Sequence, residues 1–287
     1  MQEYDKTLFD IDGTVLRSYR GNESKVTVPD GVTSIEYNAF ATSGVTEVIL
    51  PESVTNIGYS AFKACSGLEK INIPAGVKTI RDEAFRGCGA LKEVTLPEGL
   101  TAIGRWAFTG CAELTQLTVP QTVTSVGYSA FSDCKKLENV HIGGQIEMID
   151  DNLFAGCGEL KEVTLPQSIK TVGKWAFSDC KTLKEVVLPN GVTSIGEGAF
   201  KDCWGMENVT LPESLVEIDR WAFAGCNGLK EILIPKNVVL MGMCVFTDCN
   251  GLQIKCNRKR AYYGKKWNKS WLGSNTDPLK VTWLVKK

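Results

Sequence analysis

The side chains with the clearest potential for chemistry are eleven cysteines and a single histidine. Zinc sites bring cysteines together as Cys-x-x-Cys pairs, usually with histidine, and this chain contains no such pair. Nine of the cysteines instead recur every 23 residues, at Cys65, Cys88, Cys111, Cys134, Cys157, Cys180, Cys203, Cys226 and Cys249. This spacing predicts small, buried, reduced residues and no metal or other cofactor. Cys244 and Cys256 lie outside the series, and a disulfide between them is the alternative that the spacing leaves open.

A second candidate for chemistry is the segment Leu8-Phe9-Asp10-Ile11-Asp12-Gly13-Thr14-Val15, which resembles the first motif of haloacid-dehalogenase-like phosphatases. In that family the position of Asp10 is the nucleophile and that of Asp12 the acid/base. The reaction also needs an α/β sheet, a distant lysine and further carboxylates that bind Mg²⁺, yet a repeated pattern begins here at Val26. We therefore predict that residues 1–25 form an N-terminal β-hairpin cap with Asp12-Gly13 as its turn.

Other catalytic patterns are missing from the sequence. It contains no phosphate-binding Gly-x-x-x-x-Gly-Lys-Ser/Thr loop, no His-Glu-x-x-His and no Gly-x-Ser-x-Gly. Asp150 and Asp151 are expected to be solvated in a turn. His141 is expected to be an ordinary outward residue of a strand, with a ligand contact or a pH-sensing role as the alternative. We predict a protein that is not an enzyme.

The elements that position these residues are repeats. Each cysteine of the 23-residue series follows a phenylalanine by three residues, mostly as Ala-Phe-x-x-Cys. The best-formed copy reads Leu68-x-x-Ile71-x-Ile73-Pro74-x-x-Val77-x-x-Ile80-x-x-x-Ala84-Phe85-x-x-Cys88. A fixed period of this length predicts a solenoid, because each unit is too small to bury its own apolar face and stacking supplies the core.

Each coil is predicted to contain a strand, a turn, a second extended segment and one helical turn. Ile71 and Ile73 alternate as inward residues of the strand, and Pro74 ends it because proline lacks the N–H that would extend the ladder. Val77 and Ile80 belong to the second segment, and the helical turn carries Ala-Phe. The repeated phenylalanines and aliphatic residues should form core ladders.

The repeat pattern resembles the BspA-type, or treponemal-type, leucine-rich repeats of bacterial surface proteins over about residues 26–254. The resemblance implies an α/β repeat solenoid, a right-handed leucine-rich-repeat coil with short parallel strands and about ten 23-residue repeats. It also implies a secreted or cell-surface location. The implied function is non-catalytic recognition of, or adhesion to, a protein on a host or neighbouring cell, although fold analogy names no partner. The alternative is a carbohydrate-binding module of the cell envelope.

One coil departs from the pattern. It reads His141-Ile142-Gly143-Gly144 where other coils carry Ile-Pro or Leu-Pro. Glycine permits backbone conformations that proline forbids, so the solenoid is expected to kink or open near Gly143 and Gly144.

Charge separates the last segment from the repeats. Residues 255–287 hold ten Lys/Arg and one Asp, a local charge of +9 that leaves −10 for residues 1–254. An acidic repeat region repels nucleic acid, and no apolar run approaches the length of a membrane span. Residues Met1-Gln2-Glu3-Tyr4-Asp5 lack the basic-then-apolar pattern of a signal peptide. We expect a basic C-terminal cap in which Asn257 begins a helix and Tyr263, Trp267 and Trp271 share one face. Binding of this helix to an anionic membrane surface is the alternative.

Two surfaces are candidates for partner binding. The first is the outward face of the strand ladder, read either as a solvated surface or as an acidic binding face. Its glutamates are Glu47, Glu93, Glu162, Glu185 and Glu231, with Ile49, Val187 and Leu233 as apolar interruptions and His141 in the same outward positions.

The second surface comprises three tryptophans that stand two positions before the phenylalanine. These are Trp106, Trp175 and Trp221, preceded by Arg105, Lys174 and Arg220. Stacking of the preceding cationic side chain is one interpretation, and a protein or sugar contact is the other. Because the tryptophans belong to the fourth, seventh and ninth coils, we do not expect them to form one patch.

Overall fold

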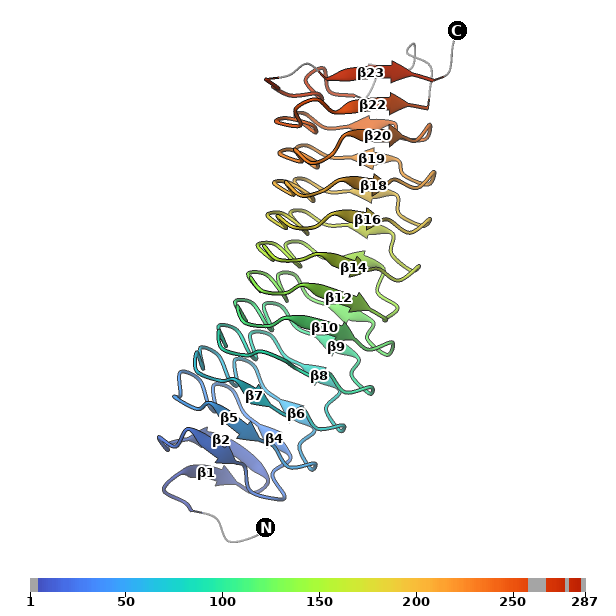
Figure 1. Ribbon diagram of the computed structural model, residues 1–287. Coiled ribbons are helices and arrows are strands. Elements are labelled where there is room, and N and C mark those ends of the chain that lie inside the picture. The colour runs from blue at the N-terminus through green and yellow to red at the C-terminus, as the bar shows by residue number, and fades with distance from the viewer. Residues whose placement is uncertain (1–4, 258–266, 277–278, 285–287) are drawn as a thin grey trace. The chain divides into compact units, whose positions relative to one another are not determined.

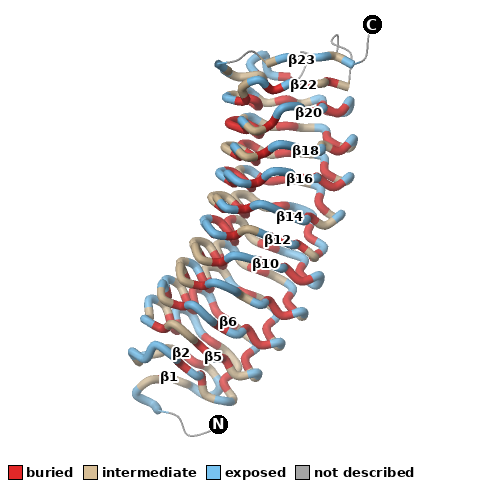
Figure 2. The backbone as a smooth tube through the Cα atoms, in the orientation of Figure 1, coloured by how far each residue is buried: buried red, intermediate tan, exposed pale blue. Residues whose placement is uncertain are grey.

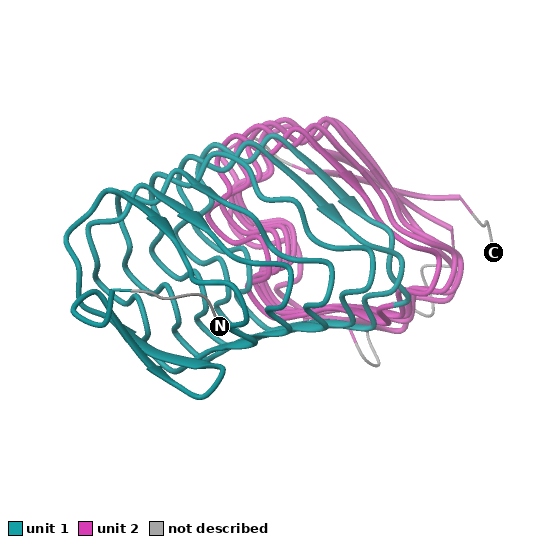
Figure 3. Ribbon diagram, turned by 90° about the horizontal axis from the view of Figure 1, so that it is seen from below, with its two compact units in different colours: residues 1–145 teal, residues 146–287 magenta. Residues whose placement is uncertain are grey.

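The computed structural model describes residues 5–257, 267–276 and 279–284, which contain twenty-three short strands and no helix (Figure 1). It follows that none of these residues belongs to a helix able to cross a lipid bilayer. The chain forms two compact units, residues 1–145 and 146–287 (Figure 3), each described here by itself. The boundary between the units follows Gln145, one residue after Gly143 and Gly144, where the repeat pattern is broken. The expected division into a cap, a solenoid and a basic cap stays a prediction.

Unit 1 carries two sets of strands, apart from the N-terminal hairpin. The first strands, which hold the Ile71 position of the repeat, are β3 (Lys25–Thr27), β5 (Glu47–Ile49), β7 (Lys70–Ile71), β10 (Gln116–Val119) and β12 (Asn139–Ile142). The second strands are β4 (Ser34–Ile35), β6 (Asn56–Ile57), β8 (Thr79–Ile80), β9 (Ala102–Ile103) and β11 (Ser125–Val126). Paired strands of both sets are parallel and join equivalent repeat positions, as in Leu117 opposite Val140. Each residue therefore faces its own counterpart in the next coil.

Unit 2 repeats the arrangement. Its first strands are β14 (Glu162–Thr164), β16 (Glu185–Val187), β18 (Asn208–Thr210), β20 (Glu231–Ile234) and β22 (Gln253–Cys256), followed by β23 (Lys280–Trp283). Its second strands are β13 (Met148–Ile149), β15 (Thr171–Val172), β17 (Ser194–Ile195), β19 (Glu217–Ile218) and β21 (Leu240–Met241), which form one parallel sheet in this order.

The helical turn expected around Ala-Phe was wrong, and the backbone shows why. Ser60 and Ala64, on either side of Phe62, have left-handed φ angles of 54° and 58°. The amide of Phe62 donates to the carbonyl of Ala84 in the next coil at 2.8 Å, so it is not available for an intrahelical bond. The amides of Ser60 and Ala64 likewise donate to carbonyl oxygens of the next coil. The segment is a run of turns that pairs with its neighbours, and the fold is a β-solenoid; the right-handed coil stays a prediction.

The phenylalanine ladder forms the centre of each unit, as expected. In unit 1 the rings from Phe40 to Phe131 stack with centroid distances of 4.9–5.5 Å. In unit 2 those from Phe154 to Phe246 stack at 5.3–5.8 Å. All are at most 1% exposed, and Figure 2 shows buried positions recurring from coil to coil. Stacking of these buried rings packs each coil against the next within a unit.

The first end of unit 1 is closed by a hairpin. Strands β1 (Phe9–Asp12) and β2 (Val15–Tyr19) are antiparallel, and Leu16 is fully buried. The Tyr19 ring stacks on Phe40 at 5.1 Å and so extends the phenylalanine ladder. The carboxylates of Asp10 and Asp12 form ion pairs with Arg20 and Arg17.

Two tryptophans cover the last coil of unit 2. Trp271 is 1% exposed and meets the Phe246 ring edge-on at 5.8 Å. Trp267 forms a bridge with Met241, and its indole N–H donates to the Val238 carbonyl at 3.3 Å. Most of the expected C-terminal helix, including Tyr263, lies outside the described residues. Its last part, residues 267–273, forms a bridge and turns instead of a helix.

Candidate binding surfaces

The position two residues before each ladder phenylalanine is left-handed in every coil, with φ between 53° and 58°. In unit 1 it is occupied by Asn38, Ser60, Glu83, Trp106 and Ser129, and in unit 2 by Asn152, Trp175, Gly198, Trp221 and Cys244. Glycine and asparagine tolerate this conformation, whereas a bulky residue pays about 1–2 kcal/mol for it. Local backbone preference therefore opposes tryptophan at this position, where the chain carries it three times.

Two of the three tryptophans meet in unit 2. The Trp175 and Trp221 rings have centroids 6.3 Å apart and planes inclined at 38°, although a coil separates them. Gly198 occupies the coil between them, and a Cβ atom there would lie 2.4 Å from two carbons of the Trp175 ring. The expectation that the tryptophans form no shared patch was wrong for this pair. The missing side chain at Gly198 brings the rings together.

Ion pairs flank the two rings. The Arg220 guanidinium lies 4.9 Å from the Trp221 ring and 2.8 Å from the carboxylate of Glu197. On the Trp175 ring, the Lys201 ammonium lies at 5.9 Å and binds the Asp202 carboxylate at 2.8 Å. The charges around the rings are thus neutralised in pairs.

The expected stacking of each tryptophan on its preceding cation occurs once, between Arg220 and Trp221. Trp175 is approached by Lys201 rather than by Lys174, whose backbone amide donates to Asp151 at 2.7 Å. In unit 1, Arg105 lies over Tyr128 at 5.4 Å instead of over Trp106. Most of these cation–ring contacts join residues of neighbouring coils rather than residues adjacent in the sequence, because the spacing between coils is close to the width of an aromatic ring.

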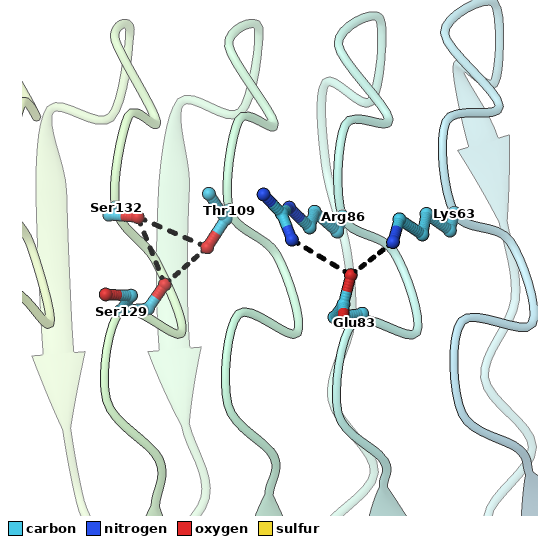
Figure 4. A network of polar contacts seen from close by, with 6 residues as sticks. All are labelled: Lys63, Glu83, Arg86, Thr109, Ser129 and Ser132. Atoms are coloured by element: carbon cyan, nitrogen blue, oxygen red, sulfur yellow. Dashed lines mark hydrogen bonds and ion pairs between the residues drawn. The ribbon is translucent and has the colours of Figure 1, made fainter.

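Trp106 is half-buried and makes its contacts within unit 1. Its ring meets Tyr128 edge-on at 4.5 Å and lies 5.8 Å from the Arg86 guanidinium. Glu83 holds Arg86 at 3.0 Å and Lys63 at 2.6 Å (Figure 4), and the hydrogen bond from Lys63 lowers the pKa of Glu83. The same figure shows the neighbouring contacts among Thr109, Ser129 and Ser132. The charged and hydroxyl groups of these residues therefore have their partners in the same coil or in an adjacent coil of unit 1.

A shallow pocket of about 240 Å³ lies beside this group in unit 1. Arg81 and Arg105 line it together with Tyr59, and the Arg81 guanidinium lies 5.2 Å from the Tyr59 ring. Asp82 also lines the pocket, and its carboxylate accepts a hydrogen bond from the backbone amide of Arg105 at 2.8 Å. Its cationic and aromatic groups are therefore already in contact with each other.

The strand face places its glutamates outward. Glu47 binds Lys25 at 3.0 Å, a hydrogen bond that lowers the pKa of Glu47, and Glu231 binds Lys255 at 2.6 Å. Glu93 is exposed but belongs to no strand, contrary to expectation. His141 is exposed in β12.

Glu162 and Glu185 line a shallow depression of about 510 Å³ in unit 2. Lys161, Thr164, Lys184 and Val187 also line it. Neither glutamate forms an ion pair within the part of the chain that the structure describes. The exposed fractions of Val187, Leu233 and Ile49 are 59%, 46% and 49%. The first-strand face of unit 2 therefore combines charged side chains of both signs with the accessible apolar surface of Val187 and Leu233.

The ladder cysteines are buried, as expected, and have a structural contact. In unit 1, Cys65, Cys88, Cys111 and Cys134 each lie 3.0–3.4 Å from the carbonyl oxygen of the preceding coil's phenylalanine. Cys180, Cys203, Cys226 and Cys249 do the same in unit 2. Burial raises the pKa of Cys134 and of Cys249 to about 12. No disulfide joins Cys244 to Cys256, and the described residues contain no metal-binding cluster.

Comparison with known families agrees with this architecture. The family model for the BspA-type leucine-rich repeat region matches residues 18–138 and 126–253, in six copies. The chain belongs to the BspA-type leucine-rich repeat family.

Several solved structures resemble this chain. A leucine-rich repeat protein of T. pallidum is 31% identical with a TM-score of 0.59, and the match covers 63% of this chain and 91% of that one. One from Bacteroides ovatus is 25% identical with a TM-score of 0.55, covering 95% and 94%. The pneumococcal vaccine antigen PcpA, 21% identical with a TM-score of 0.53 and covering 86% and 78%, shares the fold. No curated protein matches the sequence.

Sequence reasoning missed two residues of this BspA-type repeat surface. One is Gly198, whose signal in the sequence is that it stands between two tryptophans at the same repeat position. Trp204 was overlooked because it stands four residues after its phenylalanine. It is 51% exposed, its N–H points to Asp202 at 3.5 Å, and the Lys181 ammonium lies 4.8 Å from its ring.

Proposed function

We propose that this chain is a non-catalytic recognition module of a bacterial surface or secreted protein. It binds a protein on a host or neighbouring cell through the first-strand face of unit 2. The BspA-type repeat family supports the general role, because stacked repeats present an extended surface suited to binding. No chemistry is assigned to Asp10 and Asp12, since both carboxylates form ion pairs within the hairpin.

The observation that carries the proposal is the exposure of Val187 in β16, beside the charged depression of unit 2. Its side chain is more than half exposed and adjoins Glu162 and Glu185. Leu233 in β20 adds a second exposed apolar side chain to the same face. Accessible apolar area rimmed by charge is typical of protein-binding surfaces. The partner should present apolar side chains together with charged groups that complement the glutamates and lysines of the depression.

Adhesion of beads that carry the purified chain to epithelial and bacterial cells tests the proposal. We expect adhesion that is lost when the cells are treated with protease. The substitutions Val187→Lys and Leu233→Lys should each reduce adhesion several-fold, because a lysine introduces charge into the apolar contact. Thr118→Lys, at the same outward repeat position in β10 of unit 1, is the matched control and should leave adhesion unchanged. Adhesion that survives protease, or that all three variants retain, would contradict the proposal.

The alternative function, a carbohydrate-binding module of the cell envelope, is favoured by a different observation. The pairing of Trp175 with Trp221 creates an aromatic surface that the strand face does not have.

A further inference from the structure

We propose that unit 2 carries a binding site for an uncharged oligosaccharide made of pyranose units with equatorial hydroxyl groups. The site is the paired-tryptophan platform, defined as Trp175, Gly198 and Trp221 with the ion pairs Glu197–Arg220 and Lys201–Asp202. It lies on the turn segment of the coils and not on the strand face. The inference therefore rests on the alternative function, which it deepens, and it can fail independently of the proposed protein recognition.

The geometry of the rings favours a flat ligand that lies across both of them. A centroid distance of 6.3 Å is within the range of direct aromatic contact, so no slot remains between Trp175 and Trp221. A proline ring or a quaternary ammonium group needs such a slot or cage. The rings instead meet at 38° beside Gly198, and both tryptophans are half-buried, so part of each remains exposed next to Lys201 and Arg220. The flat C–H face of a pyranose with equatorial hydroxyl groups can stack on that exposed part.

The charges at the platform favour an uncharged ligand. Lys201 and Arg220 already lie over the two rings, which disfavours a cation, and each is paired with a carboxylate, which disfavours an anion. Guanidinium and ammonium groups donate hydrogen bonds, and the carboxylates of Glu197 and Asp202 accept them. The hydroxyl groups at the edge of a sugar ring both donate and accept, so they can bind either member of each pair.

The unfavourable left-handed backbone conformation of the two tryptophans argues against a purely structural role for the platform. Trp175 and Trp221 have φ angles of 56° and 57°, where asparagine or glycine would be less strained. The equivalent residues Asn152, Gly198 and Cys244 of unit 2 show that the fold does not require a large ring there. A residue that the fold does not require, held in an unfavourable conformation and partly exposed, is expected at a ligand site.

The exposed side chain of Trp204 extends the aromatic surface, so the site suits a ligand longer than one sugar. Asp202 connects the Trp175 side, through Lys201, to the exposed Trp204. An oligosaccharide can therefore stack on the platform and continue towards Trp204, whereas a monosaccharide would use only part of the site.

Titration calorimetry with cellohexaose and xylohexaose tests the site. We expect at least one of them to bind, and Trp175→Asn and Trp221→Asn each to weaken binding at least tenfold. Asparagine suits the left-handed backbone, so these variants should keep the thermal midpoint of the parent chain. Trp106→Asn is the matched control: it removes a tryptophan from the same repeat position, but in unit 1, and should leave binding unchanged.

A further variant separates ring placement from ring removal. Gly198→Asn keeps both tryptophans and adds a side chain where the Trp175 ring now lies, so it should also weaken binding at least tenfold. The proposal is overturned if neither oligosaccharide binds at millimolar concentration, or if the bound one ignores these substitutions. Binding of a decaproline peptide in place of the sugars, with loss in the same variants, would overturn it in favour of a peptide site. Protease-sensitive adhesion through Val187 would be unaffected by any of these results.

Discussion

The Cys180 thiol donates a hydrogen bond to the backbone carbonyl oxygen of Phe154, one coil earlier, at 3.3 Å. The amide of Phe154 donates to the Ala176 carbonyl in the next coil, so both backbone polar groups of this buried residue are satisfied. Cysteine thus supplies a small apolar volume and a weak donor at one position.

Removing this donor should destabilise the fold. Cys180→Ala leaves the Phe154 carbonyl without its partner, and we expect the free energy of unfolding to fall by about 1–3 kcal/mol. Cys180→Ser keeps a donor, as Ser43 does at the equivalent position of an earlier coil, and should cost less. Urea denaturation followed by circular dichroism measures both. Equal losses for alanine and serine would show that volume, rather than hydrogen bonding, selects cysteine.

Stability should fall in alkaline solution. Burial raises the pKa of Cys134 and of Cys249 to about 12, against about 8.5 for a thiol in an unfolded chain. Between these values the folded protein binds more protons than the unfolded protein, so the stabilisation is complete below about pH 8.5 and is lost as pH rises towards 12. Each such thiol contributes a slope of up to about 1.4 kcal/mol per pH unit.

Denaturation midpoints at pH 8, 9.5 and 10.5 check this expectation. A Cys134→Ala variant, though less stable throughout, should show a shallower decline than the parent chain. A parallel decline in both proteins would assign the pH dependence to other groups.

The second left-handed position of each coil allows a stabilising substitution. Ala64 is exposed and has a φ of 58°, so Ala64→Gly relieves backbone strain without loss of packing and should stabilise the protein by about 1 kcal/mol. Gly110, at the equivalent position, has a φ of 74° and no atom nearer than 3.7 Å to a new Cβ. Gly110→Ala should therefore cost about 1 kcal/mol from the backbone alone.

Thermal unfolding compares these variants. Ala75→Gly is the matched control because Ala75 is exposed and has no positive φ; it should destabilise slightly by increasing the freedom of the unfolded chain. If Ala64→Gly and Ala75→Gly shift the midpoint in the same direction, the strain argument fails.

Truncation of the phenylalanine ladder should be among the most damaging substitutions. Phe177 is fully buried and stacks on Phe200 at 5.3 Å with ring planes 2° apart. Phe177→Ala should lower the free energy of unfolding by about 3–5 kcal/mol because it removes a large side chain and leaves a cavity. Val187→Ala, at an exposed strand position, should have almost no effect on the same urea denaturation curve.

The C-terminal cap shows what the spacing of aromatic residues in the sequence can predict and what it cannot. Trp267 and Trp271 were expected to cover the last coil from one face of a helix, and both do cover it. They do so from a bridge and turns, because the backbone there pairs with the last coil: the Asn268 amide donates to the Met241 carbonyl, and the Ser270 carbonyl accepts from the Cys244 amide. Aromatic spacing identified the contact, whereas the partner of each backbone group depended on the neighbouring coil.

The sequence by itself determined the solenoid, the phenylalanine and cysteine ladders and the family, because a residue repeated every 23 positions meets its own copy and must suit that contact. Only the tertiary structure decided the form of the Ala-Phe segment, since its amides bond to the next coil and its flanking residues are left-handed. It also decided which tryptophans meet. Trp175 and Trp221 are 46 residues apart in the chain, and their contact depends on inter-coil stacking and on the space left by Gly198.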